Sequence, residues 1–293
     1  MDVQFLWLRP ALGHQWKWSG RACRLVPLSG AEWVNFKAPS PGGVQIYAPP
    51  PGLFREFAGL NIANDERRQK EILTFADKYG DIVAQPQEGH LMDVTTPWGE
   101  KIRKHATQET WHRSIQHIRL AVDLWDQIND PKSHKELRHL FVRSPGAIVY
   151  KMTVYKRTPE SGGERYQRDW VAVPIATGKD VAAYPANDII RPARRALQQE
   201  IRRALTDTET PSHATPYLTP ELRLVTAPEN LLAYMWLTFA RVVSGEIEER
   251  RCVTCPEHFY VGSGPGLRRA DKVTCSHACR KRKERQEGRR IAR

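Results

Sequence analysis

The chain has 293 residues, of which 40% are hydrophobic and nine are tryptophan, and this is enough to build a buried core in one large domain or in two smaller ones. This composition excludes disorder throughout the chain. The net charge of +12 favours an anionic partner such as nucleic acid, although charge alone says nothing about the fold.

The N-terminal part of the chain is predicted to contain short strands followed by two helices. The first fifty residues alternate apolar stretches with turn formers and end in YAPPPG, which indicates two or three strands and a loop. A helix capped by Asn64 or Asp65 is expected to run to about Tyr79, with Gly80 as its stop. A longer helix is expected from about 106 to 128, because apolar residues recur there at helical spacing: Trp111, Ile115, Ile118, Val122 and Trp125.

The next part of the chain mixes strands and helices. The runs GAIVYKMTVYKR and RYQRDWVAVPIA flank TPESGGE, which is typical of a β-hairpin with a loose loop. Asp188 is expected to cap a helix whose buried face contains Ile190, Ala193, Leu197, Ile201 and Leu205. A strand at ELRLVTA and an apolar helix at ENLLAYMWLTFARVV follow. Because strands and helices do not alternate as in a doubly wound sheet, the predicted fold class is α+β.

A domain boundary is expected near Ser244 and Gly245, where the apolar helix gives way to the charged sequence GEIEERR. Residues 1–245 are therefore predicted to form an α+β domain of unknown role, and residues 246–293 a small second domain. Residues 250–293 contain thirteen Lys or Arg against four Asp or Glu, a surplus of nine in a chain whose net charge is +12. Three-quarters of the excess positive charge therefore lies in the last forty-four residues.

Four of the five cysteines cluster in the second domain, at Cys252, Cys255, Cys275 and Cys279. Two close pairs separated by nineteen residues are typical of a tetrahedral zinc site, in which a short hairpin joins the pairs. Four thiolates would leave no open coordination position, so we expect one structural Zn²⁺ and no catalytic metal. His258 and His277 are alternative ligands that the spacing leaves open.

The distribution of cysteines also bears on the compartment. A cluster of four with Cys23 standing alone fits metal binding in a reducing cytosol better than a disulfide framework. The N-terminus lacks a secretory pattern and no stretch approaches eighteen apolar residues, so we expect neither export nor a membrane span. The expected location is cytoplasmic, and no feature of the sequence indicates an oligomeric state.

A basic helix is expected to follow the last cysteine pair, with Ser276 as its N-cap. Lys281, Arg282, Arg285 and Arg289 share one arc of about 100°. Glu284 and Glu287 lie on the other side, where they can pair with Arg280 and Lys283. The helix has no apolar stripe, so a metal at one end and a polyanion along one side are the expected sources of its stability. The candidate nucleic-acid contacts, which favour phosphates, are Arg268, Arg269, Lys281, Arg282, Arg285 and Arg289.

The stretch RCVTCPEHFYVGSGPGLRRADKVTCSHACRKRKER resembles the treble-clef-like zinc fingers that end in a Cys-Ser-x-x-Cys knuckle and a basic helix, in particular those of the bacterial CGNR zinc-finger family. The resemblance implies that the four cysteines bind zinc, that a larger N-terminal domain precedes the finger, and that the protein is a DNA-binding transcription regulator. This chain has Arg280, Lys281 and Arg282 where the family motif would place Gly-Asn-Arg.

No catalytic pattern accompanies the finger, so an enzyme is not expected. His105 and His112 lie seven residues apart outside any His-Glu-x-x-His motif, and GSGPG lacks the Lys-Ser or Lys-Thr of a phosphate loop. We expect a zinc-finger protein that binds nucleic acid, with DNA preferred over RNA as the partner. The alternatives are a module whose finger docks a partner protein, and an enzyme with an unidentified site in residues 1–245.

Overall fold

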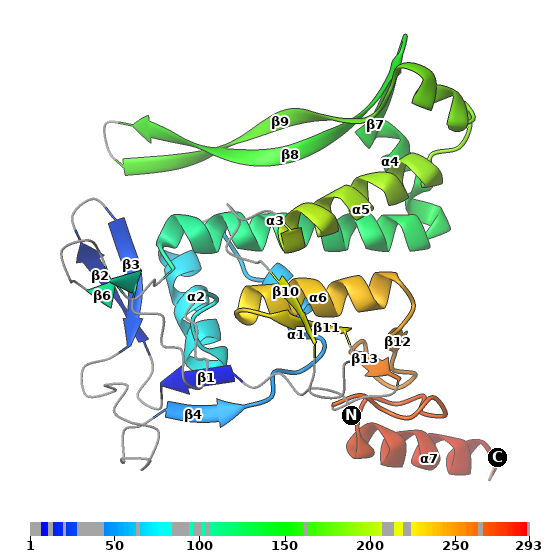
Figure 1. The fold of residues 1–293 in the computed structure, drawn as a ribbon. Helices are drawn as coiled ribbons and strands as arrows, with labels where there is room; N and C mark the ends of the chain where they lie inside the picture. Colours follow the sequence, from blue (N-terminus) through cyan, green and yellow to red (C-terminus); the bar gives the residue numbers. More distant parts are fainter. Residues whose placement is uncertain are drawn as a thin grey trace.

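The computed structural model describes residues 7–10, 14–19, 22–27, 44–62, 65–83, 94–95, 101–102, 106–160, 163–206, 214–218, 224–262 and 266–291. Over these residues the fold is α+β, as the sequence predicts. Helices pack together at the centre, and small antiparallel sheets lie around them (Figure 1).

The helices and strands have the following bounds. The helices are α1 (Leu53–Ala58), α2 (Asp65–Tyr79), α3 (Gln108–Asn129), α4 (His134–Leu140), α5 (Ile190–Thr206), α6 (Leu231–Val243) and α7 (His277–Ile291), with 3-10 turns at Pro131–Ser133 and Gly178–Ala183. The strands are β1 (Trp7–Pro10), β2 (His14–Ser19), β3 (Ala22–Pro27), β4 (Val44–Tyr47), β5 (Val94–Thr95), β6 (Lys101–Ile102), β7 (Phe141–Ser144), β8 (Ala147–Glu160), β9 (Gly163–Thr177), β10 (Ala214–Leu218), β11 (Leu224–Pro228), β12 (Glu248–Arg251) and β13 (His258–Val261).

The first fifty residues contain four described strands, one more than the upper limit of the prediction. β2 pairs with β3 as a local hairpin, whereas β1 pairs with the distant β4, from Trp7 opposite Tyr47 to Pro10 opposite Val44. The pairing of β1 with β4 spans more than thirty residues of sequence, so no local turn signal indicates it.

Helix α3 is the central helix of the body, and its predicted apolar stripe is largely buried. Trp111, Ile115 and Ile118 are fully buried, and Trp125 is partly buried at the other end of the stripe. The helix begins after Thr107, whose side chain accepts a hydrogen bond from the Thr110 N–H at 3.0 Å. This cap satisfies one of the N–H groups that the first turn of a helix leaves free.

Two further predicted helices form with the expected ends. α2 begins at Asp65 and is followed by Gly80, whose φ of 87° is the left-handed conformation that favours glycine at a helix end. The Asp188 carboxylate accepts hydrogen bonds from the N–H groups of Ile190 and Arg191 at the start of α5. The end of α2 and the start of α5 therefore lie where short-range chemistry requires, while the predicted cap Asn64 lies outside the described residues.

A three-stranded sheet in the order β7-β8-β9 lies across α3 and α5 (Figure 1). Ile148 and Tyr150 on β8 are buried, so this part of the sheet packs on the helices. The loose loop expected over TPESGGE is wrong in extent, because backbone pairing continues to Glu160 opposite Gly163. Regular antiparallel pairing satisfies backbone N–H and C=O groups that a loose loop would leave to water.

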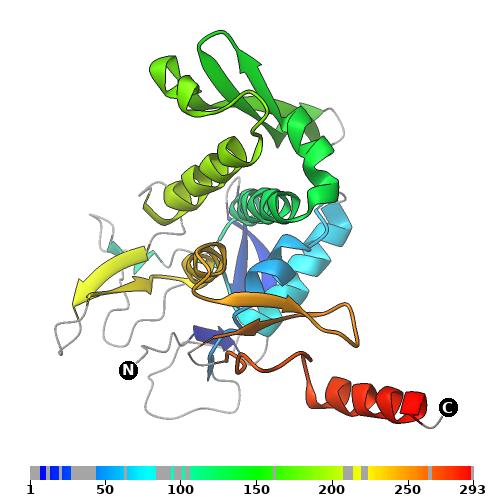
Figure 2. The same cartoon turned by 90° about the vertical axis from the view of Figure 1, so that its right-hand side faces the viewer.

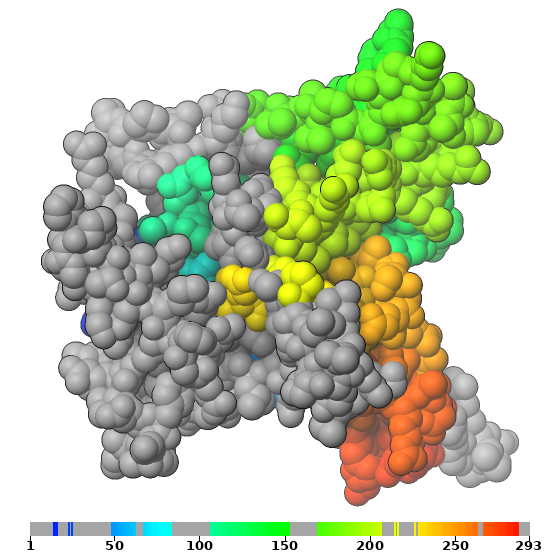
Figure 3. All heavy atoms as spheres, in the orientation of Figure 1, coloured from blue at the N-terminus to red at the C-terminus, as the bar shows by residue number. Residues whose placement is uncertain are grey.

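The C-terminal segment from β12 to α7, which we call the finger (residues 246–293), lies at one corner of the molecule (Figure 3). β12 and β13 pair from Glu248 opposite Val261 to Arg251 opposite His258. α7 extends away from the helical body (Figure 2). In the part of the chain that the structure describes, no helix combines the length and apolar character needed to cross a membrane.

Candidate metal centre

The four cysteines predicted as ligands come together at the base of α7. Their sulfur atoms all lie within 4.8 Å of one another. The Cys255 and Cys275 sulfurs are 3.4 Å apart, and the Cys279 sulfur is 3.6 Å from each of them. All four thiols are free rather than joined in disulfides. The sequence spacing therefore predicted the cluster correctly.

Hydrogen bonds to backbone groups connect the two cysteine pairs with each other. The sulfur of Cys252 accepts from the backbone N–H of Cys275 at 3.4 Å, which connects the two pairs. The Thr254 hydroxyl donates to the Cys279 carbonyl at 3.3 Å and makes a second connection. Phe259 and Val261 on β13 are buried against Cys252 and Cys279 and form the small apolar core of the finger.

Helix α7 begins at the second cysteine pair. The Ser276 hydroxyl accepts a hydrogen bond from the Cys279 N–H at 3.2 Å, so Ser276 caps the helix as predicted. Cys279 lies in the first turn, and its side chain is directed back to the other sulfurs. The direction of α7 is thereby tied to the position of the sulfur cluster.

The electrostatics of the cluster favour a bound cation. Burial raises the pKa of Cys252, but backbone N–H donors from Cys275, Thr254 and Cys255 outweigh it and lower the pKa to about 6. Burial and hydrogen bonding to the neighbouring thiols raise the pKa of Cys275 to about 12. Four thiolates this close repel one another, so full ionisation of the cluster requires a positive ion among the sulfurs.

The donor set and its size fit zinc. A tetrahedral ion with Zn–S distances of about 2.3 Å places its sulfur ligands about 3.8 Å apart. The measured separations of 3.4 and 3.6 Å are close to this value. Ca²⁺ and Mg²⁺ prefer oxygen ligands, so a site made of four sulfur donors suits neither ion.

Neither alternative ligand belongs to the cluster. Among the described residues, only one group of three or more His, Cys, Asp or Glu side chains is close enough to share a metal ion, and it contains the four cysteines alone. His277 is exposed in the first turn of α7. The Nδ1 atom of His258 lies 3.1 Å from Oε1 of Glu249, at the junction with the body. Within the part of the chain that the structure describes, the four cysteines thus form the whole donor set of the cluster.

Most of the predicted nucleic-acid residues are exposed. Arg268, Arg269, Lys281, Arg282 and Arg285 all lie in the solvent-accessible part of the finger, while the side chain of Arg289 lies outside the described residues. The backbone of Arg268 is fixed to β13, since its N–H donates to the Tyr260 carbonyl at 2.8 Å. Arg280 pairs with Glu284 at 3.7 Å, as the helical spacing predicts.

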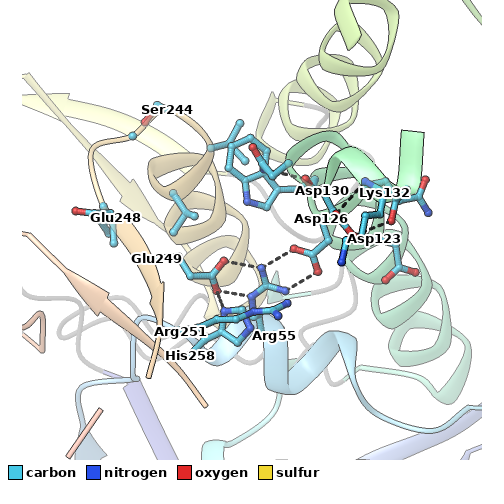
Figure 4. A pocket seen from close by; sticks show the side chains of 18 residues that line it. Arg55, Asp123, Asp126, Asp130, Lys132, Ser244, Glu248, Glu249, Arg251 and His258 are labelled. Atoms are coloured by element: carbon cyan, nitrogen blue, oxygen red, sulfur yellow. Dashed lines mark hydrogen bonds and ion pairs between the residues drawn. The ribbon is translucent and has the colours of Figure 1, made fainter. Parts of the chain in front are cut away.

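The finger is joined to the helical body through Arg55 of α1 (Figure 4). The Arg55 guanidinium donates to both oxygens of Asp126 on α3, at 2.9 and 2.8 Å, and also to both oxygens of Glu249 on β12. Burial lowers the pKa of Arg55, but its hydrogen bonds to Asp126 and Glu249 and the charges of these carboxylates outweigh burial and raise it. One side chain therefore links three elements.

An aromatic contact accompanies this ion-pair junction. Tyr260 on β13 is buried in the main core, and its hydroxyl donates to Glu249 at 2.8 Å. Its ring centroid lies 5.9 Å from that of Phe54 in an edge-on arrangement. Gly52 is required here, because a Cβ atom added to it would lie 2.5 Å from the Tyr260 ring. The YAPPPG turn thus forms part of the junction.

Beside the junction runs an open groove of about 1160 Å³, which we call the junction groove (Figure 4). Its walls come from α1, α3, the end of α6, β12 and β13, and they include Asp123, Asp126, Asp130, Lys132, Ser244, Glu248, Glu249, Arg251 and His258. Sequence reasoning missed Arg55 and Glu249, because 194 positions separate them and no short-range pattern relates them. The only available signal was the charged pair Arg55 and Glu56 within the otherwise apolar segment LFREFA.

Comparisons of the chain with protein-family models, with curated proteins and with solved structures gave no match in any of the three.

Proposed function

We propose that the finger binds one structural Zn²⁺ through Cys252, Cys255, Cys275 and Cys279 and contacts nucleic acid, with DNA as the partner, in the role of a transcription regulator. The observation that carries the proposal is the four-sulfur cluster at the first turn of an exposed basic helix. The proposed role is binding without catalysis, in a cytoplasmic protein.

The metal would fix the orientation of the basic side chains of α7 relative to the rest of the finger. Zinc binding at Cys279 would hold the start of α7 against the hairpin, and the exposed side chains of Lys281, Arg282 and Arg285 would then have one direction relative to the finger. The basic side chains are not accompanied by a set of polar side chains that could read base edges. They therefore favour contacts with phosphates over contacts with bases. We therefore expect affinity with modest sequence preference.

A second candidate function is docking of a partner protein. Val253 and Val273 are 62% and 41% exposed on the finger, and their backbones are joined by a hydrogen bond of 3.2 Å. Two exposed valines side by side favour a small apolar contact. Such a contact would depend little on salt, whereas a phosphate contact depends on it steeply.

A salt titration of duplex-DNA binding tests the proposal. If about four basic residues neutralise phosphates, the slope of log affinity against log salt should be about −3 to −4. Arg285→Ala combined with Arg289→Ala should reduce the magnitude of the slope by about two units. Arg191→Ala combined with Arg195→Ala removes the same charge from α5 and should leave the slope unchanged. Equal affinity of the wild type and the Arg285/Arg289 variant at low salt would reject phosphate binding and favour protein docking.

A further inference from the structure

A second groove, separate from the metal centre, lies among three helices of the body. It has a volume of about 600 Å³ and is lined from α3, α5 and α6 and the residue after α6. α5 and α6 pack against each other, and both face the viewer in Figure 3. We call it the helical groove, and its lining residues are Trp125, Arg194, Leu197, Gln198, Ile201, Arg202, Ala240, Val243 and Ser244.

The inner part of this groove is apolar. Leu197 is only 1% exposed, and Ile201, Trp125 and Val243 are partly buried hydrophobic residues that pack on the main core. The apolar residues come from all three helices, so a molecule in the groove would touch apolar surface on more than one side. An acyl chain or a comparable apolar group gains free energy when it leaves water for such a surface.

Two cations stand at the edge of this apolar surface. Arg194 and Arg202 are exposed and lie eight residues apart on α5, a separation of about 12 Å along the helix. Leu197 and Ile201 lie between them along the helix axis and line the same groove. The lining contains no acidic residue. The groove therefore combines an apolar interior with a positive rim that no acidic residue of its described lining neutralises.

The other arginines of α5 differ from these two. Arg191 pairs with Asp188, Arg195 bonds to Gln198, and Arg203 pairs with Glu200. The guanidinium groups of Arg194 and Arg202 make no hydrogen bond or ion pair with any residue that the structure describes. With respect to the described residues, these donors can therefore bond to an anion in the groove.

From this combination we propose that the helical groove binds a small amphipathic carboxylate, with its apolar portion on Leu197, Ile201 and Val243 and its carboxylate paired with Arg194 or Arg202. A cationic amphiphile would meet the same apolar surface but be repelled by the rim. A nucleic acid would meet the arginines but gain nothing from the apolar interior. This proposal does not rest on nucleic-acid contact at α7.

The helical groove lies next to the segment that connects the body to the finger. Val243, Ser244 and Trp125 line both the helical groove and the junction groove. Ser244 directly follows α6, and β12, which contains Glu249, begins four residues after Ser244. A bound carboxylate would therefore touch the segment that connects the body to the finger.

Calorimetric titration of the full-length protein with decanoate tests this site, using decanol and decyltrimethylammonium as probes of equal chain length below their micellar concentrations. Decanoate should bind saturably at one site per chain. Decanol should bind about tenfold more weakly or worse, because it lacks the charged hydrogen bonds, and the cation should bind most weakly. Equal affinity for decanoate and decanol, or no saturable binding of decanoate, would overturn the proposal.

A pair of charge-matched variants locates the site. Arg194→Gln combined with Arg202→Gln should reduce the affinity for decanoate to that of decanol. Arg191→Gln combined with Arg195→Gln removes the same charge from the same helix outside the positive rim and should leave the affinity unchanged. If both double variants weakened decanoate binding equally, general charge rather than this groove would be responsible. The probe series on the wild type decides the matter even if a variant fails to fold.

Discussion

Arg55 is largely buried and also bonds to two carboxylates, and these two properties make its side chain important for stability. Its side chain is only 18% exposed, and it bonds to a carboxylate of the body and to a carboxylate of the finger, Asp126 and Glu249. A planar guanidinium can bond to two oxygens of each carboxylate, which an ammonium group cannot do. Removal of the guanidinium would leave Glu249, whose side chain is 10% exposed, as a buried charge with fewer donors.

We predict that Arg55→Met lowers the free energy of unfolding by about 3 kcal/mol, since breaking one side of a buried ion pair typically costs about 3 to 5 kcal/mol and Asp126 is half-exposed. Arg55→Lys should recover only part of the loss. Urea unfolding measures both. Arg113→Met breaks the exposed pair between Arg113 and Glu109 and serves as the control, with a change below about 1 kcal/mol. A loss for Arg55→Met no larger than that of the control would contradict the assigned role.

Two histidines of α3 should make stability depend on pH. Burial, together with nearby arginines, lowers the pKa of His112 and His117 to about 4. In the unfolded chain a histidine has a pKa of about 6.5, so unfolding takes up protons between about pH 6.5 and pH 4. The contribution to stability is therefore complete above pH 6.5 and is lost as the pH falls toward 4.

His117→Gln should reduce this acid-induced loss by about 1 to 3 kcal/mol between pH 7 and pH 4. The comparison of urea midpoints for the variant and the wild type isolates the histidine, because acid affects the cysteine cluster in both proteins alike. His139→Gln is the control, since His139 is exposed and its surroundings change little on unfolding. Parallel pH profiles for wild type and His117→Gln would show that His117 is readily protonated in the folded state.

At the scale of elements, the sequence predicted best where a repeating pattern was long enough to have a period. The stripe of α3 and the helix α5 each extend over four or more turns, and every predicted apolar position of the two helices packs on the main core. Ile190, Ile201 and Leu205 are only partly buried, because α5 lies at the side of the helical body beneath β8 and β9. Caps at Asp188 and Ser276 depend on neighbouring atoms alone and were predictable for that reason.

The missed elements include two whose local sequence signal is weak. α1 has only six residues, too few for a helical period, although Leu53, Phe54 and Phe57 are almost completely buried. β10 carries a proline, which weakens a strand prediction, and it pairs with β11 in a sheet of two described strands. The same limit applies to the candidate sites: paired cysteines indicate their own cluster, whereas Arg55 acquires its role only after folding.

The finger as an element should depend on its metal. Cys279→Ser removes one of four sulfur ligands, so the purified variant should lose the one equivalent of zinc expected in the wild type. Amide hydrogen exchange should then accelerate over β12, β13 and α7, because the apolar core of the finger is small. Cys23→Ser, a buried cysteine outside the cluster, is the control and should retain zinc. A metal-free wild type with a protected α7 would contradict the prediction.

At the scale of the whole molecule, the boundary predicted after Gly245 remains a prediction, and the contacts across it bear on its consequence. Most residues of the main core precede Gly245, but Ile247 and Tyr260 of the finger also belong to it. Truncation after Gly245 should therefore leave a fragment that unfolds cooperatively but at a lower temperature. Loss of about 3 kcal/mol of burial and pairing corresponds to a decrease of roughly 5 to 10 °C.

Differential scanning calorimetry of residues 1–245 beside the full-length chain measures this decrease. A matched variant, Tyr260→Leu in the full-length chain, keeps the finger but removes the hydroxyl and the ring, and should fall between the two. An insoluble or non-cooperative fragment would mean that the body and the finger share one core. An unchanged transition would mean that the junction contributes nothing to the stability of the body.

The close approach of Tyr260 to Gly52 has a consequence for protein engineering. The surface on which the finger rests is built largely from Gly52, Phe54 and Arg55, which precede the cysteines by about two hundred positions. Residues 246–293 grafted onto another scaffold would arrive without that surface and would expose Tyr260 and Glu249 to solvent. The transferable unit is therefore discontinuous in sequence, and a designer would need to transplant α1 and its preceding turn together with the finger.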